Sequence, residues 1–291
     1  MKKSKKGQTV LNIFFIILCA VVLYPFLMLL AVSFSNEKDI VINGYKLIPE
    51  HFDLAAYRYI FKNPESLLNA YGITIVISVL CMVFGTLFMS MIAYTLTSPK
   101  MRIKRGLSFY LYFTMLFNGG LVPTYIMNTQ YLHINDTLWI YIFPGLISPF
   151  YVFMLRTFVA AIPRALSESM KIDGADEFTI FSRLIIPLSK PVIATVALFT
   201  FLAKWNDWYT SMLYINNQNL VTLQYLLQKI FKDIQFLSDN QNIGVEIDTS
   251  KIPTTTIQMA MAVIAAGPAL IVFPFFQKYF VRGITVGSVK G

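Results

Sequence analysis

The sequence predicts an all-α integral membrane protein with six membrane-spanning helices, and three observations support this class. Hydrophobic residues make up 56% of the 291 residues and charged residues only 13%, whereas a soluble domain is about 25% charged. The mean hydropathy is +0.60. The apolar residues form six long stretches that lack the alternation of a β-barrel, so helices are the expected spanning structure.

The six predicted spans follow the apolar stretches in order. They are Val10 to Phe34, Tyr71 to Leu96, Leu107 to Met127, Leu138 to Leu155, Pro191 to Leu213, and Thr254 to Phe276. The first four contain no charged residue. The fifth carries Lys204 and Asp207, and Pro268 and Pro274 are expected to interrupt the sixth.

The distribution of basic residues predicts the orientation in the membrane. Six spans place alternate loops on opposite sides, and sixteen of the 24 Lys and Arg fall in one set of loops, against seven in the other. By the positive-inside rule, both termini and the loop of residues 162–191 face the cytoplasm. The chain is expected to divide into residues 1–70 (terminus, first span and outer loop), a core of residues 71–280, and a cytoplasmic tail of residues 281–291.

Several function classes lack support in the sequence. The basic residues are split among short loops, so no nucleic-acid surface is expected. His51 and His133 lie in loops without a second ligand nearby, and no paired carboxylates or nucleophile elbow occur, so no metal, cofactor or catalytic site is predicted. Cys19 and Cys81 lie inside spans and indicate no disulfide framework.

The loop of residues 162–191 is too highly charged to cross a membrane and predicts a hairpin of two helices. Pro163 suits the first position of a helix that carries Leu166 and Met170 on one face. Gly174 can end that helix, and Asp173 is expected to cap the second helix.

The second helix of this hairpin carries an apolar stripe of Phe178, Phe181, Leu184 and Ile185. Pro187 is expected to push the preceding residue out of helical geometry. The hairpin should therefore expose an apolar face. Periodicity alone leaves open whether this face docks onto a partner protein or rests on lipid headgroups.

The spacing within the loop resembles a known motif. Glu168, then Asp173-Gly174-Ala175, then Leu184, Ile186 and Pro187 resemble the cytoplasmic EAA loop of permease subunits of binding-protein-dependent ABC importers. Ser169 and Met170 replace the two alanines of the motif, and Leu184 and Ile186 exchange isoleucine and leucine. Three further segments, 117–125, 205–208 and 283–291, resemble the carbohydrate-uptake branch of these permeases. Within that branch, they are most similar to the maltose-type second permease and the related oligosaccharide permeases.

The resemblance implies a type I ABC importer permease fold with a coupling helix between the fourth and fifth spans. The residues that it assigns to ATPase coupling are Glu168, Ser169, Met170, Asp173, Gly174, Ala175 and Pro187. It implies four kinds of partner: a second homologous permease, a cytoplasmic ABC ATPase dimer, an extracellular solute-binding protein and a carbohydrate substrate. The chain has no Gly-x-x-x-x-Gly-Lys-Ser/Thr sequence, so ATP hydrolysis is expected in a separate subunit.

Two segments are candidates for the substrate path. Lys204 to Trp208 place charges, an amide and two indoles in the outer half of the fifth span. Trp205, Asn206, Asp207 and Trp208 could contact a sugar or form an outer gate, or they could belong to an aromatic belt. Asn118, Gly119 and Gly120 could interrupt the third span as in transporter cavities, or they could allow close helix packing.

The outer segment 214–253 combines leucines at helical spacing with an acidic stretch. The resemblance implies that it contacts the binding protein, and a solvated loop is the alternative. The predicted function is an importer permease in the cell membrane that forms half of a carbohydrate path. There are two alternatives: an ion-coupled secondary transporter or channel, and a membrane-bound assembly factor. A secondary transporter or channel usually needs buried charged relays or an internal repeat, and only Lys204 and Asp207 fit that expectation.

Overall fold

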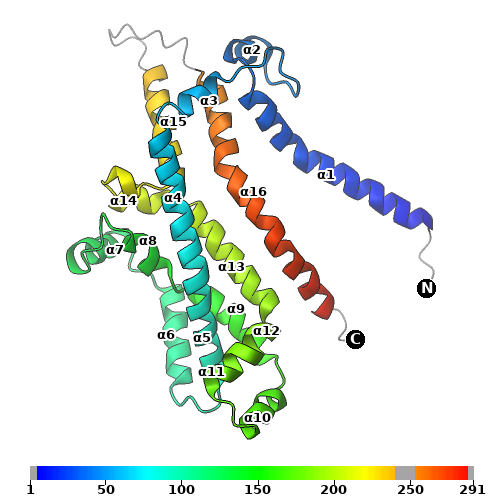
Figure 1. Ribbon diagram of the computed structural model, residues 1–291, viewed down its shortest axis with the longest axis vertical. Helices are drawn as coiled ribbons and strands as arrows, with labels where there is room; N and C mark the ends of the chain where they lie inside the picture. Colours follow the sequence, from blue (N-terminus) through cyan, green and yellow to red (C-terminus); the bar gives the residue numbers. More distant parts are fainter. Residues whose placement is uncertain (1–4, 240–252, 288–291) are drawn as a thin grey trace. The chain divides into compact units, whose positions relative to one another are not determined.

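The computed structural model describes residues 5–239 and 253–287, and within these ranges the secondary structure is helical apart from one isolated β-bridge between Ser35 and Phe52. The chain forms two compact units. The first consists of Met1–Leu67 and Leu226–Pro268, and the second of Leu68–Tyr225 and Ala269–Gly291 (Figure 1).

The first unit contains three N-terminal helices and parts of two C-terminal ones. These are α1 (Lys5–Ser33), α2 (Glu37–Asn43), α3 (Ala55–Ile60), most of α15 (Leu223–Asp239) and the first part of α16 (Thr254–Gly287). Glu37 caps the start of α16, because its carboxylate accepts hydrogen bonds from the backbone N–H of Thr255 at 2.9 Å and of Thr256 at 2.8 Å. This cap ties α2 to α16.

Helix α16 is continuous through Pro268 and Pro274. The expectation that these prolines interrupt the sixth span is therefore wrong. In a membrane helix the backbone groups that a proline frees can be satisfied by local adjustment and by neighbouring groups, so the helix tolerates it.

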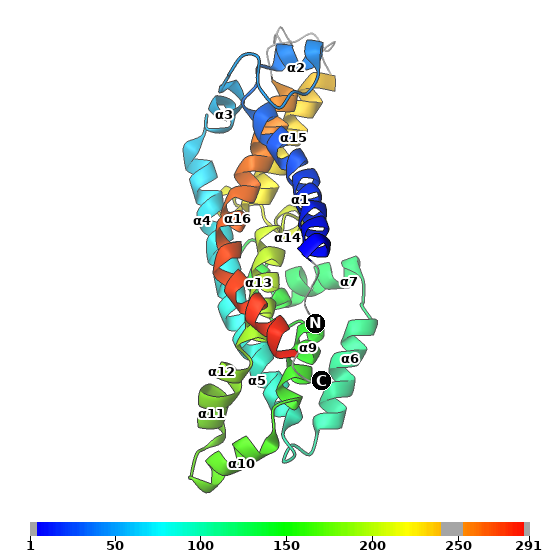
Figure 2. The same ribbon diagram turned by 90° about the vertical axis from the view of Figure 1, so that its right-hand side faces the viewer.

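The second unit is built around one long helix in three parts: α4 (Pro64–Leu80), a π-helical turn η1 (Cys81–Gly85) and α5 (Thr86–Thr97). Its packing partners are α6 (Lys104–Leu116), α9 (Pro149–Ala160) and α13 (Lys190–Trp205), which lie beside α5 in both ribbon views (Figure 2). Their shared core contains Met89, Ala93, Leu155 and Val196 among its buried residues. This apolar cluster holds the bundle together.

The third, fourth and fifth predicted spans are broken. The third divides into α6, α7 (Leu121–Ile126) and the π-helical turn η2 (Met127–Tyr131). The fourth consists of α8 (Trp139–Ile142), the 3₁₀ turn η3 (Phe143–Gly145) and α9, with a bend of 49°. The fifth ends as α13 at Trp205 and continues as α14 (Tyr209–Tyr214), not as one helix to Leu213.

By length and composition, the described residues contain three helices able to cross a membrane, or up to five if each bent pair counts as one span. The three are within α1, α4 to α5, and α16. The third predicted span is not among them, because Phe117 to Gly120 separate two short helices. The count of six spans and the division at residues 70 and 280 stay predictions.

Candidate functional site

The hairpin of residues 162–191 begins with α10 (Arg164–Ile172), which ends at a glycine turn. Gly174 has φ +83°, a left-handed conformation that favours glycine. The Ala175 N–H donates to the carbonyl oxygen of Met170 at 2.9 Å, and the Gly174 N–H donates to that of Lys171 at 3.1 Å. These two bonds make a Schellman motif, so the predicted helix end at Gly174 is confirmed.

Two local expectations for the hairpin are wrong. Asp173 is the C-cap of α10, and Asp176 caps α11 (Glu177–Ile180) by accepting from the Thr179 N–H at 2.9 Å. Ile186 keeps helical dihedrals, φ −58° and ψ −50°, because the π-helical turn η4 (Phe181–Ile185) leads directly into α12 (Ile186–Leu188). The Ile186 N–H donates to the carbonyl oxygen of Phe181, the pattern of a π-helical turn, and Pro187 follows as the second residue of α12.

The apolar stripe of the second hairpin helix faces the protein. Ile180, Phe181 and Ile185 are buried in one cluster with Val159 of α9, and Tyr94 of α5 packs against it. The expectation that this stripe forms an exposed apolar face is therefore wrong for Phe181 and Ile185. Phe178 alone of the predicted stripe stays largely exposed, at 67%.

A polar tether joins the hairpin to α5. The Tyr94 hydroxyl donates to Glu177 Oε2 at 2.6 Å, and Lys171 Nζ lies 2.8 Å from Glu177 Oε1. Glu177 therefore connects α10, α11 and a helix of the bundle. These hydrogen bonds from Lys171 and Tyr94 lower the pKa of the Glu177 carboxyl.

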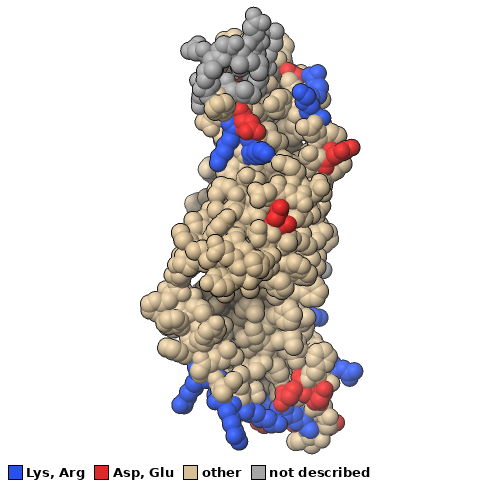
Figure 3. Space-filling view, turned by 90° about the vertical axis from the view of Figure 1, so that its left-hand side faces the viewer, with Lys and Arg blue, Asp and Glu red and all other residues tan. Residues whose placement is uncertain are grey.

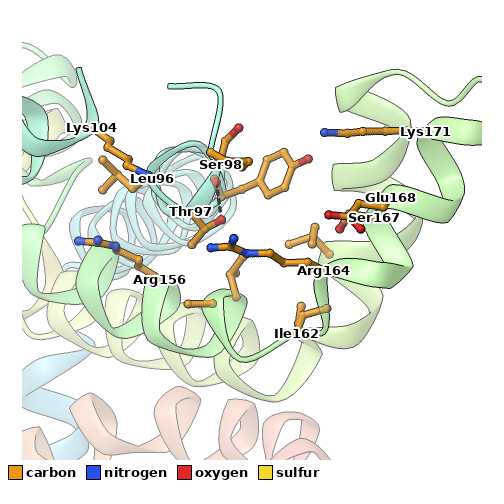
Figure 4. A pocket seen from close by; sticks show the side chains of 15 residues that line it. Leu96, Thr97, Ser98, Lys104, Arg156, Ile162, Arg164, Ser167, Glu168 and Lys171 are labelled. Atoms are coloured by element: carbon orange, nitrogen blue, oxygen red, sulfur yellow. Dashed lines mark hydrogen bonds between the residues drawn. The ribbon is translucent and has the colours of Figure 1, made fainter. Parts of the chain in front are cut away.

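The predicted coupling residues take up different positions on this hairpin. Glu168, Ser169, Asp173 and Gly174 are exposed, whereas Met170 and Ala175 pack against the apolar cluster. Pro187 lies in α12. Glu168 also lines a pocket between α5, α6, α9 and α10 together with Arg164 and Lys171 (Figure 4).

The first candidate path segment, Asn118 to Gly120, forms the break between α6 and α7. Gly120 has φ +90°, and its N–H donates to Asn118 Oδ1 at 2.8 Å. A Cβ added at Gly120 would meet no described atom within 4 Å. The glycine therefore serves the turn, and the alternative of close helix packing at Gly120 has no partner among the residues that the structure describes.

The second segment lies at the end of α13. Lys204 Nζ is 3.6 Å from Asp207 Oδ2, and the two side chains are 14% and 15% exposed. Asp207 also accepts from the Thr210 N–H at 3.0 Å and from its hydroxyl at 2.8 Å. This carboxylate stabilises the start of α14, which explains why the fifth span breaks here.

The two indoles of this segment differ in exposure. Trp205 is 1% exposed and packs near Tyr71 and Phe201, so its indole belongs to the packing core in this structure. Trp208 is 37% exposed, and Asn206 is also exposed. Of the two, Trp208 is the indole with surface available to a ligand.

Contacts that sequence reasoning missed join the broken spans to one another. Tyr125 of α7 stacks on Tyr214 of α14 at 5.4 Å, and the Asn128 side chain donates to the Tyr214 hydroxyl at 3.2 Å. The Tyr141 hydroxyl lies 2.6 Å from the Ser211 hydroxyl. These contacts join residues 70 or more positions apart, and no local sequence pattern predicts such pairings.

Part of the predicted binding-protein segment lies outside the described residues, including Glu246 and Asp248, and so do residues 288–291 of the tail. Helix α15 lies within that segment, and its Leu223 and Leu227 are buried. Among residues 5–239 and 253–287, no group of three or more His, Cys, Asp or Glu gathers as a metal site would require.

Known proteins resemble this chain over its full length. It is 37% identical to Protein LplC of Bacillus subtilis (strain 168) over 295 residues, which cover 100% of this chain and 98% of that protein. It is 36% identical to the polygalacturonan/rhamnogalacturonan transport system permease protein YtcP of the same strain, with 96% of each chain covered.

A solved structure agrees with these relatives. A chain of a bacterial ABC transporter involved in the import of the acidic polysaccharide alginate superposes with a TM-score of 0.78 and 26% sequence identity. The match covers 96% of this chain and 99% of that one. The family model described as "Binding-protein-dependent transport system inner membrane component" matches residues 1–286. With nearly the whole chain matched by that family, and with relatives above 30% identity along its full length, the chain belongs to the inner membrane components of binding-protein-dependent transport systems.

Proposed function

We propose that this chain is a permease subunit of an ATP-driven importer and forms half of the membrane path for a carbohydrate, an oligosaccharide, that an external binding protein delivers. The observation that carries the proposal is the hairpin α10–α11. It presents exposed Glu168 and Ser169 at one end of the second unit and is joined to α5 by the Tyr94–Glu177–Lys171 tether. A protein that moves α10 would thereby move a bundle helix.

The proposed complex contains a second homologous permease, an ATPase dimer and the binding protein. One chain offers only one wall of a path, so a homologous partner supplies the other. The chain lies in the cell membrane with both termini in the cytoplasm, where α10 can reach an ATPase. The proposed path residues are Asn118 to Gly120 and Asn206 to Trp208, because these breaks expose polar groups that can bond to sugar hydroxyls.

Substitutions at Gly174 test the coupling role. In the assembled importer, Gly174→Val should reduce uptake at least tenfold, because a β-branched residue in a left-handed conformation is strained by about 1–2 kcal/mol and distorts the turn. Gly174→Asn is the matched control, since asparagine tolerates this conformation, and it should retain most of the uptake. Normal uptake by a fully assembled Gly174→Val complex would contradict the coupling role.

The same assay tests the cargo. The panel should contain arabino-oligosaccharides, oligogalacturonides and alginate oligosaccharides, which match the sugars named for relatives and for the similar structure. Uptake that depends on ATP and on a binding protein is the expected result. Co-purification with an ATPase and a second permease should accompany it, whereas ATP-independent transport by this chain alone in liposomes would refute the proposal.

A further inference from the structure

A pocket of about 250 Å³ beside α10 gathers positive charge from three elements. Its cations are Lys104 at the start of α6, Arg156 of α9, and Arg164 and Lys171 of α10. Figure 4 shows Lys104 and Arg164 extending from opposite walls toward the middle of the pocket. Glu168 is the one carboxylate among the lining residues.

Most of this charge has no counter-ion within the described part of the chain. Lys171 is paired with Glu177, but no carboxylate lies within 4 Å of Lys104, Arg156 or Arg164 among the residues that the structure describes. Arg156 makes one hydrogen bond, to the Ser108 hydroxyl at 3.3 Å. Lys104 and Arg156 are partly buried, and Arg164 is exposed. Like charges that converge repel one another, and a bound anion would reduce that repulsion.

The other residues that line the pocket provide polar and apolar surface, which suits an amphipathic ligand with a polar headgroup and an apolar chain. Thr97, Ser98 and Ser167 contribute hydroxyl groups, and Leu96, Ile162 and Ile185 contribute apolar surface. Arginine recognises phosphate oxygens with paired N–H donors, which a chloride or a neutral sugar cannot use as well. In Figure 3, Lys and Arg gather at the lower end of the view, with some Asp and Glu among them, below a nearly uncharged band, as expected where a protein meets headgroups.

We propose that this pocket binds the phosphodiester headgroup of an anionic phospholipid of the inner leaflet. The headgroup bridges Arg156 of a bundle helix and Arg164 of the coupling helix, with Lys104 as the third cation, and the acyl chains follow the apolar wall. Basic pockets between membrane helices on the cytoplasmic side bind such headgroups. The inference rests on the predicted orientation and not on which substrate is carried.

Native mass spectrometry of the full chain in detergent tests the site. Phosphatidylglycerol and phosphatidylcholine with identical acyl chains are titrated separately. Phosphatidylglycerol should bind with higher occupancy, and Arg156→Gln combined with Arg164→Gln should weaken it about tenfold, because charge-assisted contacts are lost. Binding of phosphatidylcholine should not change. Helix content by circular dichroism checks the fold, and Arg156→Lys with Arg164→Lys should recover part of the affinity.

The matched control is Arg102→Gln combined with Arg105→Gln, which removes the same charge from exposed residues of the neighbouring segment that do not line the pocket. An equal loss in this control would show general surface attraction and overturn the site. Displacement of the lipid by equimolar inorganic phosphate would identify a free anion as the ligand instead. If the lipid is lost when the ATPase joins the complex, the cations bind an acidic segment of the ATPase, and the lipid site is overturned.

Discussion

Gly85 marks a close approach of two backbones in the second unit. A Cβ at this position would lie 2.9 Å from the carbonyl oxygen of Leu146, which follows the broken turn η3. Backbone atoms cannot move aside as a flexible side chain can, so only glycine fits here. Gly85 closes the π-helical turn η1, and the bend of the fourth span therefore packs directly on the middle of the second.

We expect Gly85→Ala to destabilise the protein by about 1–3 kcal/mol through overpacking. Gly72→Ala is the control in the same long helix, because its Cβ would meet no described atom within 4 Å and alanine favours helix over glycine. The control should be neutral or slightly stabilising. Thermal unfolding in detergent measures both, and equal melting temperatures would contradict the close contact.

At the scale of elements, the hairpin depends on both apolar packing and the tether. Phe181 and Ile185 anchor it on α9, and Tyr94 and Lys171 bond to the Glu177 carboxylate from two other helices. Packing fixes where the hairpin lies, and the directional bonds fix how α10 is turned. In the proposed importer, a displacement of α10 is expected to reach α5 through these contacts.

Tyr94→Phe should loosen α10, because it removes the hydroxyl that donates to Glu177. Amide hydrogen exchange in α10 should become about tenfold faster, which corresponds to one lost hydrogen bond. Tyr110→Phe is the control, since that exposed tyrosine of α6 loses the same hydroxyl. Similar exchange in both variants would show that packing alone holds the hairpin.

The tether also predicts a pH dependence. The pKa of Glu177 is lowered from its ordinary value of 4.5, so the folded state favours the ionised carboxyl. Its stabilising effect is complete above pH 4.5 and is lost as the pH falls through the lowered folded-state pKa. Acidification should therefore accelerate amide hydrogen exchange in α10 of the unsubstituted protein. The acceleration should be smaller in the double variant Tyr94→Phe, Lys171→Met, which lacks both partners of Glu177.

At the scale of the whole chain, the basic residues set the orientation that both proposals use. Sixteen of 24 Lys and Arg occur in one set of predicted loops. The hairpin and the cationic pocket belong to that set, whereas η5 (Gln218–Leu220) follows α14 in the opposite set. The positive-inside rule therefore predicts that α10 lies in the cytoplasm and η5 outside.

Cysteine labelling checks this orientation. In a background of Cys19→Ala and Cys81→Ala, a membrane-impermeant maleimide should label the Gln218→Cys variant in intact cells and the Ser169→Cys variant only after the membrane is opened. Both positions are exposed, so a difference in labelling reflects the side of the membrane. Labelling of both variants in intact cells would reject the orientation and, with it, the inner-leaflet lipid site.

The sequence alone determined the class of the protein and the glycine turn at Gly174. Apolar runs and sparse charge indicate helices in lipid whatever their packing, and Gly174 ends α10 through a backbone conformation that depends on one residue. The motif spacing also pointed to the family that the comparisons confirm.

Only the tertiary structure decided where the spans break and which faces are covered. Hydropathy does not reveal a bend, so the breaks at Gly145 and Asn206 are found only in the structure. For Asn118 to Gly120 the sequence left an interrupted span and close helix packing open, and the structure shows the break. The structure shows that Trp205 is buried in the core and that Phe181 packs against the bundle, although the sequence predicted exposed roles for both. The tether and the cationic pocket join residues far apart in sequence, and such long-range contacts arise from packing that no local pattern encodes.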